Sequence, residues 1–317
     1  MSINRAHADS GNDRADTCVA VLLSTFNGER YLNEQLASFT AQSHTNWLLY
    51  WRDDGSSDGT VALMTDFASG PGAGRVQSLP SGSRLRPTGS FMALLRSALD
   101  GPADCFAFAD QDDVWLPDKL AHGVAALSGL SSDRPGLYFC GRALVGPDLS
   151  PAGQVLAPRR APGFPAALTQ NLAPGCCMIL NRAAAATICS APVPDGTWHD
   201  WWAYLAVSAT GGMVIAGGTP DILYRQHGLN LVGEPRGFRH RFAGAVRRGR
   251  SPFMTLFWRQ AEALSALPLS PAARAQLRII GRGKGNPGAR LMALRLPGFR
   301  RQTWAETALF RLWFLLG

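Results

Sequence analysis

The sequence predicts an α/β protein with a single mixed sheet flanked by helices, and two observations carry this prediction. Continuous apolar runs typical of buried strands occupy three segments, at residues 19–23, 47–51 and 105–109. Apolar residues at helical spacing follow or precede these runs, at residues 31–39, 61–67 and 91–98. Strands and helices that alternate in this way favour parallel strands joined by right-handed crossovers. Further apolar runs at 137–140, 176–180, 212–216 and 222–224 are expected to complete the sheet.

The composition indicates one large domain with an appendage. The chain has 317 residues, of which 46% are hydrophobic, and it contains no run of 18 apolar residues, so no membrane-spanning helix is expected. Residues 1–17 are polar and lack the apolar core of a signal peptide, which predicts a disordered tail. The six cysteines have no metal-ligand spacing and are expected to be free thiols of a cytoplasmic protein.

The charge is divided sharply between two parts of the chain. Residues 1–235 contain 15 Lys/Arg and 21 Asp/Glu, whereas residues 236–317 contain 16 and 2. This division predicts metal-assisted chemistry in the first part and contact with an anionic surface in the second. We therefore expect a catalytic domain at 18–233 and a basic helical extension at 234–317.

Three carboxylates directly follow the apolar run at 105–109, in the segment Asp110-Gln111-Asp112-Asp113. Carboxylates this close repel one another, so a partner cation is expected, although a solvated acidic turn is the alternative. Open α/β sheets bind their ligands at the carboxyl ends of the strands, where these acids would lie. The chain has neither a G-x-G-x-x-G nor a G-x-x-x-x-G-K-[ST] motif, so side chains and a cation would have to hold any nucleotide.

Five motifs in a fixed order extend this pattern over residues 18–233. They are Ser24-Thr25-Phe26-Asn27-Gly28-Glu29, Asp53-Asp54-Gly55-Ser56-Ser57-Asp58, Asp110-Gln111-Asp112-Asp113-Val114-Trp115, His199-Asp200-Trp201-Trp202 and Tyr224-Arg225-Gln226-His227-Gly228. This set resembles the inverting family 2 glycosyltransferases, which have the Rossmann-like GT-A fold. The form of the last three motifs is most similar to the rhamnosyltransferase-like branch that builds bacterial surface polysaccharides.

The resemblance implies a nucleotide site at the ends of the first two strands. Asp54 matches the acid that accepts a hydrogen bond from the pyrimidine ring N–H. Its neighbour Asp53 is either a second base contact or a solvated acid. Thr25, Asn27 and Glu29 match the loop that borders the base and ribose, and capping of the next helix is the alternative role, above all for Asn27.

The resemblance also implies a Mg²⁺ or Mn²⁺ ion at the acidic segment. Asp110 and Asp112 match the family's D-x-D pair, with Asp112 as the metal ligand and Asp110 as a contact of the ribose or of a metal-bound water. Asp113 would orient Asp112 or cap the following helix. Arg225 is suited to the diphosphate, and a neutral His227 could bind the metal.

Asp200 matches the catalytic base of the family. In an inverting transfer one carboxylate takes the proton of the acceptor hydroxyl, and no second nucleophilic acid is needed. The alternative is an acid favoured at a helix N-terminus by the macrodipole. His199 and Trp201 are expected to support this site, whereas Trp202 is expected to be a core residue.

The basic C-terminal part should contain two or three helices. Helix starts are predicted at Ser270-Pro271 and at the capping box Thr303-Trp304-Ala305-Glu306. Arginines cluster with histidine at 239–250, and the helices combine basic residues with Trp, Phe and Leu, which fits attachment to an anionic membrane surface. The alternative is an appendage that packs on the catalytic domain. Nucleic-acid binding is disfavoured because no nucleic-acid motif accompanies the charge.

Together these patterns predict a transferase of hexosyl groups (EC 2.4) at the inner face of the cytoplasmic membrane. The donor implied by the resemblance is dTDP-L-rhamnose, and the acceptor a saccharide, free or on a polyprenyl diphosphate. Alternatives are another UDP- or GDP-sugar donor, a nucleotidyltransferase that makes nucleotide sugars, or a polyanion binder without activity. A nucleotidyltransferase should carry a Gly-rich loop with Lys or Arg after the first strand, and Ser24–Glu29 contains neither basic residue.

Overall fold

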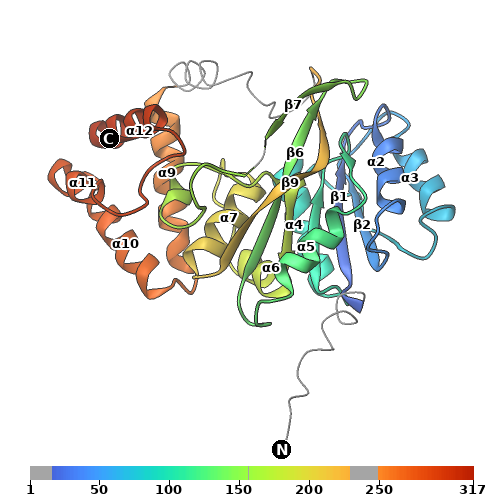
Figure 1. Cartoon of the computed structure of the whole chain (residues 1–317), viewed down its shortest axis with the longest axis horizontal. Coiled ribbons are helices and arrows are strands. Elements are labelled where there is room, and N and C mark those ends of the chain that lie inside the picture. Colours follow the sequence, from blue (N-terminus) through green and yellow to red (C-terminus); the bar gives the residue numbers. More distant parts are fainter. Residues whose placement is uncertain (1–15, 156, 229–248) are drawn as a thin grey trace, which may run out of the picture.

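The computed structural model describes residues 16–155, 157–228 and 249–317, and Figure 1 shows the chain as a sheet with helices on both sides. The described strands form one nine-stranded sheet in the order β3-β2-β1-β4-β8-β6-β9-β5, with β7 paired to β6. The strands are β1 (Val19–Thr25), β2 (Trp47–Asp53), β3 (Val76–Ser78), β4 (Cys105–Ala109), β5 (Val114–Trp115), β6 (Gly136–Val145), β7 (Pro151–Val155), β8 (Met178–Asn181) and β9 (Met213–Arg225). The predicted mixed sheet is confirmed.

One half of the sheet is parallel, and this half positions the acidic segment. Strand β1 pairs in parallel with β2 and with β4, and β2 pairs in parallel with β3. Residues of β1 and β4 are almost wholly buried, as expected for strands covered on both faces. The loops after β1, β2 and β4 therefore leave the same edge of the sheet. The antiparallel strand β8 joins this half to β6, and β6 runs parallel to β9.

Helices cover the sheet and continue beyond it. Those packed around the strands are α2 (Leu32–Thr40), α3 (Thr60–Ser69), α4 (Arg86–Leu99), α5 (Lys119–Leu127), α6 (Arg182–Cys189) and α7 (His199–Ala209). The C-terminal ones, drawn in orange and red in Figure 1, are α9 (Arg250–Ala263), α10 (Pro271–Arg282), α11 (Pro287–Ala293) and α12 (Trp304–Leu316). None of the helices in the described ranges is long and apolar enough to cross a membrane.

The described C-terminal part contains four helices, against the two or three expected. Helices α10 and α12 begin where the sequence predicts, and the group packs through aromatic side chains. Ser270 Oγ accepts a hydrogen bond from Ala273 N at 3.2 Å, and Thr303 Oγ1 accepts one from Glu306 N at 3.2 Å. Buried phenylalanines contributed by α9, α12 and the segment between α11 and α12 contact one another: Phe257, Phe299, Phe310 and Phe314. Residues 1–15 of the expected tail, the domain boundary at 233/234 and most of the arginine cluster at 239–250 lie outside the described residues.

Several local predictions need correction. Cys176 and Cys177 belong to a 3₁₀ turn (Gly175–Cys177), and the strand begins only at Met178. The segments expected at 212–216 and 222–224 are one continuous strand, β9. Strand β7 lies between the predicted runs at 137–140 and 176–180, where no strand was expected. Strands β3 and β5 were not predicted because two or three residues give no readable periodicity. All six cysteines are free, as expected.

Candidate active site

The centre of the site is a group of acids after β4. Ligand atoms of Asp110, Asp113 and Cys176 all lie within 4.8 Å of one another. Asp113 is fully buried, and its Oδ1 accepts a hydrogen bond from Arg225 N at 3.0 Å. Its Oδ2 has no hydrogen-bond partner among the described residues. A buried carboxylate oxygen without a donor is costly, so this group fits a position beside a cation.

Asp112 and His227, the two predicted metal ligands, lie side by side. His227 Nε2 is 2.8 Å from Asp112 Oδ2, although 115 residues separate them in the chain. Both side chains keep some exposure, 20% for Asp112 and 10% for His227, so they form the open side of the acidic group. The His227 ring packs against Tyr31 with 4.8 Å between ring centroids. A carboxylate beside an imidazole is a donor set that accepts a divalent metal ion.

Asp200 lies in the first turn of α7, where the macrodipole favours an acid. Its Oδ2 accepts a hydrogen bond from Gly175 N at 3.2 Å, and its Oδ1 accepts one from Trp201 N at 2.6 Å. Burial raises the pKa of Asp200 to about 6, and these backbone hydrogen bonds limit the rise. A carboxylate with this pKa is ionised at neutral pH and remains basic enough to accept a proton.

The carboxylates act on one another electrostatically. Burial, followed by the charges of Asp112 and Asp200, raises the pKa of Asp110 to about 7. Burial and the charges of Asp112 and Asp110 likewise raise the pKa of Asp113 well above its ordinary value. The charges of these four acids, Asp110, Asp112, Asp113 and Asp200, therefore affect one another at the end of the sheet. Such accumulated negative charge favours the binding of a cation, and the side chains present fit one.

The loops after β1 and β2 are joined by an internal hydrogen-bond network. Thr25 Oγ1 donates to Asp53 Oδ1 at 3.0 Å, and Asp53 Oδ2 accepts from the amides of Gly55 and Ser56. Asn27, which has a positive φ of 49°, accepts from Ser57 N. Glu29 Oε2 accepts from Gly59 N at 3.0 Å. Asp53 is thus an internal anchor, which corrects its expected role as a solvated acid. Asn27 and Glu29 fix the β2 loop instead of capping their own helix.

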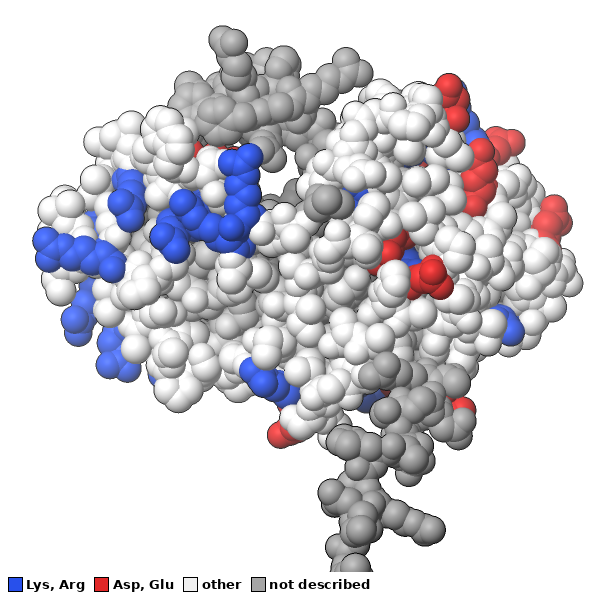
Figure 2. Space-filling view, in the orientation of Figure 1, with Lys and Arg blue, Asp and Glu red and all other residues white. Residues whose placement is uncertain are grey.

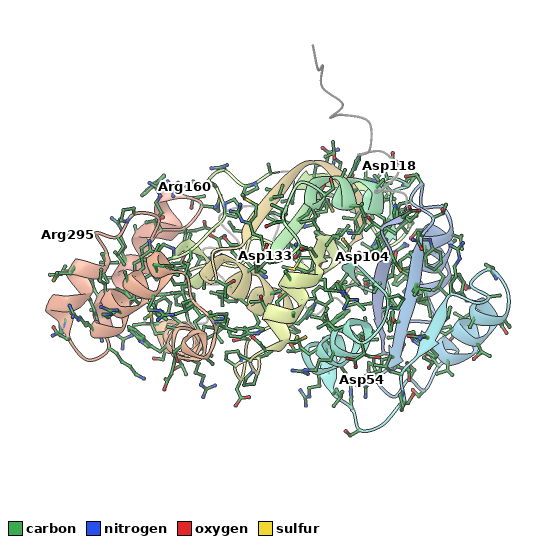
Figure 3. All side chains as sticks on the ribbon, turned by 90° about the horizontal axis from the view of Figure 1, so that it is seen from below. Asp54, Asp104, Asp118, Asp133, Arg160 and Arg295 are labelled. Carbon is green, nitrogen blue, oxygen red and sulfur yellow. The ribbon has the colours of Figure 1, made fainter. Side chains whose placement is uncertain are left out.

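Asp54 is buried between its own strand and the start of α4. Its Oδ1 accepts from Arg52 Nη1 at 2.6 Å and from Leu85 N, and its Oδ2 accepts from Arg86 N. Burial alone would raise the pKa of Asp54, but these donors outweigh it and lower the pKa. Arg84 covers this end of the site with its guanidinium 3.8 Å from the centre of the Phe26 ring. In Figure 3 Asp54 lies in the half of the molecule away from the C-terminal helices.

Arg225 does not have the expected place beside a diphosphate. Its side chain is only 1% exposed, and its guanidinium donates to the carbonyl oxygens of Asp112 and Pro147 and to Glu34. It also lies 4.5 Å from the centre of the Tyr31 ring. The geometry corrects the predicted role, because Arg225 is committed to holding the acidic loop against α2 and the β6–β7 turn.

His199 and Trp201 support the site by packing. The His199 ring stacks on Phe91 with 4.2 Å between centroids, and neither ring nitrogen has a hydrogen-bond partner among the described residues. Burial lowers the pKa of His199 to about 3, so the ring is neutral. Trp201 Nε1 donates to Ala167 O at 2.7 Å, which ties α7 to the 3₁₀ turn at Ala166–Leu168. Trp202 is fully buried, as predicted.

Gln111 is a positioning residue that sequence reasoning missed. Its Oε1 accepts from Phe26 N at 2.8 Å and its Nε2 donates to Phe26 O at 3.0 Å, so it pairs with the backbone like a neighbouring strand. A Cβ placed on Gly28 would lie 2.4 Å from Gln111 Oε1. The glycine therefore makes room for the glutamine. The only sequence signal was its place between two predicted site acids.

Replacing Gln111 with alanine should loosen the contact between the β1 loop and the acidic loop. Two part-buried hydrogen bonds are lost, so we expect a free energy of unfolding lower by about 1–3 kcal/mol and a higher KM for the donor. Denaturant unfolding and initial-rate kinetics measure both effects. Gln77→Ala, at an exposed position of β3, is the matched control and should change neither. Equal KM values for Gln111→Ala and Gln77→Ala would contradict this role.

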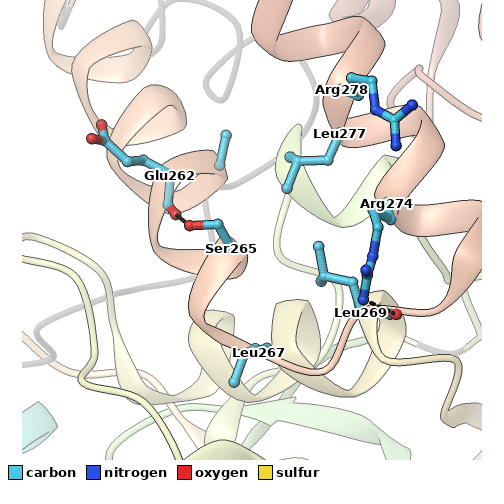
Figure 4. Close-up of a pocket in the computed structure, with 8 residues that line it drawn as sticks. Glu262, Ser265, Leu267, Leu269, Arg274, Leu277 and Arg278 are labelled. Carbon is cyan, nitrogen blue, oxygen red and sulfur yellow. Dashed lines mark hydrogen bonds between the residues drawn. The ribbon is translucent and has the colours of Figure 1, made fainter.

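A separate groove lies among the C-terminal helices, between α9 and α10 (Figure 4). Leu267, Leu269 and Leu277 line it together with Arg274 and Arg278. None of its lining residues belongs to the acidic site. Arg274 reaches Leu269 O at 3.5 Å, so this arginine also holds the segment that precedes α10.

The mixed sheet with acids at its carboxyl edge has the architecture of a GT-A sugar transferase. Residues 20–186 match the family model described as Glycosyl transferase family 2. The chain therefore belongs to glycosyl transferase family 2 and is a glycosyltransferase (EC 2.4) that uses a nucleotide sugar.

Two relatives carry more specific names. The chain is 27% identical over 248 residues to "dTDP-rhamnosyl transferase RfbG" of Shigella flexneri. The aligned region covers 71% of this chain and 79% of that protein. It is 26% identical over 112 residues to "UDP-Glc:alpha-D-GlcNAc-diphosphoundecaprenol beta-1,3-glucosyltransferase WfgD" of Escherichia coli, which covers 35% and 42% of the two chains.

Solved structures agree on the fold. S. aureus TarS 1–349 in complex with UDP-GlcNAc superposes with a TM-score of 0.54 at 15% identity, over 82% of this chain and 70% of that one. The mannosyltransferase PcManGT of Pyrobaculum calidifontis, in complex with GDP-Man and Mn²⁺, gives 0.50 at 18% identity, over 94% and 86%. At these identities the likeness establishes the GT-A fold alone.

Proposed function

We propose that this glycosyltransferase inverts the anomeric centre of its donor and uses Asp200 as the base. The observation that supports this most directly is the position of Asp200, which accepts a hydrogen bond from Gly175 N next to Cys176 and whose charge acts on Asp110. Asp200 is a carboxylate with a pKa of about 6 that lies near the acids proposed to hold the nucleoside diphosphate. This separates a proton acceptor from a cation-binding group, as a single displacement requires.

The step is a direct displacement at the anomeric carbon. The acceptor hydroxyl oxygen forms the new bond to that carbon, while its proton passes to an Asp200 carboxylate oxygen. The bond from the carbon to the diphosphate oxygen breaks, and the nucleoside diphosphate leaves with the electron pair. The hydrogen bonds from Gly175 N and Trp201 N to Asp200 keep the carboxylate oriented while it accepts the proton.

Asp112 and His227 would hold a Mg²⁺ or Mn²⁺ ion in this site. Such an ion neutralises the negative charge on a departing diphosphate. Asp113 would act through Asp112 and Arg225, because its Oδ1 is fixed by Arg225 N. Asp110 would face the ribose or a water of the ion. The relative PcManGT, whose structure contains Mn²⁺, supports this choice of cation.

The nucleotide base and ribose would lie over the joined loops after β1 and β2. Asp54 would accept from the ring N–H of the base, with Thr25, Asn27 and Glu29 along the same edge. The hydrogen bonds that already fix these side chains would preorganise them for the ligand. Asp53 would support Thr25 from beneath.

We further propose dTDP-L-rhamnose as the donor and a lipid-linked saccharide of surface polysaccharide synthesis as the acceptor. The name of the S. flexneri relative supports the donor, and the name of the E. coli relative supports a diphosphate-lipid acceptor. An enzyme with such an acceptor would work at the inner face of the cytoplasmic membrane.

A donor panel tests this function. Purified protein is incubated with Mn²⁺ and, separately, dTDP-rhamnose, UDP-glucose, UDP-GlcNAc or GDP-mannose, and release of the nucleoside diphosphate is measured with and without saccharide acceptors. We expect release from dTDP-rhamnose alone, stimulated by an acceptor. Release from another donor would overturn the choice of rhamnose, whereas pyrophosphate formation from a nucleoside triphosphate and a sugar phosphate would identify a nucleotidyltransferase.

A further inference from the structure

Helix α12 is apolar on both of its sides. Its inner side chains, Phe310, Trp313 and Phe314, are buried against the other C-terminal helices. Its outer side chains include Trp304, Leu312 and Leu316, which are 80%, 52% and 59% exposed. Residues eight and four positions apart lie on one side of a helix, so these three form a single outward stripe.

Helix α11 adds to this stripe. Leu291 and Met292 are 55% and 62% exposed, and α11 contacts α12. Arg290 Nη1 donates to Leu315 O at 2.9 Å, and Arg311 Nη2 reaches Leu294 O at 3.5 Å. These hydrogen bonds hold the segment that carries Leu291 and Met292 against the C-terminal half of α12. We call these five exposed side chains, together with Arg295, Arg300 and Arg311, the α11–α12 face.

This concentration of apolar side chains is unusual for a free surface. Of the eight large hydrophobic residues that are exposed in the described ranges, five lie on the α11–α12 face. Isolated exposed leucines need no explanation, but a contiguous patch bordered by polar residues marks an interaction site. The packing of α12 does not depend on its outer side chains, because its inner side supplies the aromatic contacts.

Positive charge surrounds the same face. Residues 249–317 contain 11 Lys/Arg and 2 Asp/Glu. Arg295, Arg300 and Arg311 are exposed on or next to α11 and α12. Figure 2 shows basic residues gathered over the C-terminal helices, whereas most acidic residues visible in that view lie over the strand-rich part. Apolar side chains flanked by arginines are complementary to an anionic lipid surface.

We propose that the α11–α12 face docks on an anionic membrane surface. Trp304, Leu312 and Leu316 would enter the boundary between head groups and acyl chains, and the arginines would contact lipid phosphates. The helices would lie on the membrane, since none in the described ranges is long enough to span it. A second copy of the chain fits less well, because a symmetric pairing would bring two arginine-rich surfaces together. The inference deepens the proposed function by naming the membrane contact, but it rests on this surface and not on sugar transfer.

Vesicle co-sedimentation of the full chain tests the proposal. We expect binding to vesicles of phosphatidylcholine mixed with phosphatidylglycerol, little binding to phosphatidylcholine alone, and weakening by salt. The triple variant Trp304→Ser/Leu312→Ser/Leu316→Ser should bind at least about tenfold less. Arg295→Glu/Arg311→Glu should lose the preference for anionic lipid. Val61→Ser, at an apolar residue of α3 that is 43% exposed, is the control and should bind as the unaltered chain does.

Two further measurements separate the possible results. The first is the increase in melting temperature that a nucleoside diphosphate with Mn²⁺ causes. It should be equal in all of these variants if the fold and the donor site are intact. Failure of the unaltered chain to bind anionic vesicles, or equal binding by the triple variant, would overturn the proposal. Sedimentation velocity that shows a dimer lost in the triple variant would assign the face to a second copy instead. Neither result depends on which sugar is transferred.

Discussion

Asp200→Asn should reduce kcat by about 10²–10⁴-fold, the usual contribution of a general base. The asparagine oxygen can still accept from Gly175 N, so the fold and the orientation of the side chain should persist. What is lost is the ability to take the acceptor proton. Initial rates with saturating donor and acceptor measure the effect, and thermal stabilisation by the nucleoside diphosphate should not change.

Asp195→Asn is the matched control, since this acid is exposed just before α7 and has no part in the proposed chemistry. Its activity should equal that of the unaltered enzyme. An Asp200→Asn enzyme that transfers sugar at the control rate would remove Asp200 from the mechanism.

The pH profile should carry the signature of the same carboxyl group. Burial raises the pKa of Asp200 to about 6, and the base functions only when it is ionised. We therefore expect kcat/KM to be constant above that pH and to fall about tenfold per unit below it. The residual activity of Asp200→Asn should not show this decrease at low pH. If the variant shows the same decrease at the same pH, the titration belongs to another group.

The sequence was sufficient to predict the elements that position the site. Strands β1, β2 and β4 contain short continuous apolar runs, which are too short for a buried helix and are followed by polar turn residues. Their parallel order places Asp54 and Asp110 at one edge. Helix α7 begins at His199 and positions Asp200 in its first turn.

The roles of individual polar side chains could not be predicted, because they depend on partners distant in the chain. Arg225 looked free for a phosphate, yet its partner Glu34 lies 191 residues away. Asp54 looked unpaired, yet the amides of Leu85 and Arg86 already donate to its oxygens and fix the carboxylate beside the proposed place of the base. His199 lies between aromatic rings from α4 and β4. Motif order locates a site, whereas the hydrogen bonds of each member appear only with the fold.

Asp112→Asn should remove cation binding and lower transfer by about 10²-fold or more, because a carboxylate ligand and its charge are both lost. The asparagine can still contact His227, so the local packing should remain. Isothermal titration with Mn²⁺ in the presence of the nucleoside diphosphate measures binding independently of activity. Asp100→Asn, an exposed acid after α4, should bind Mn²⁺ normally. Undiminished Mn²⁺ affinity in Asp112→Asn would exclude Asp112 as a ligand.

The same substitution should stabilise the metal-free protein. This effect distinguishes the repulsion between the carboxylates from their role in binding a cation. The charge of Asp112 helps to raise the pKa of both Asp110 and Asp113. Where the pKa of a carboxyl group is raised in the folded state, the folded protein loses stability as pH increases toward and through that raised pKa. The folded state must then hold an unfavourable charge. Removing Asp112 weakens this repulsion, so metal-free Asp112→Asn should melt above the metal-free enzyme at pH 8, and the difference should shrink below the ordinary pKa of an aspartate. The acids are thus held together at the expense of stability, and a bound cation offsets that repulsion in the unaltered enzyme but not in the variant.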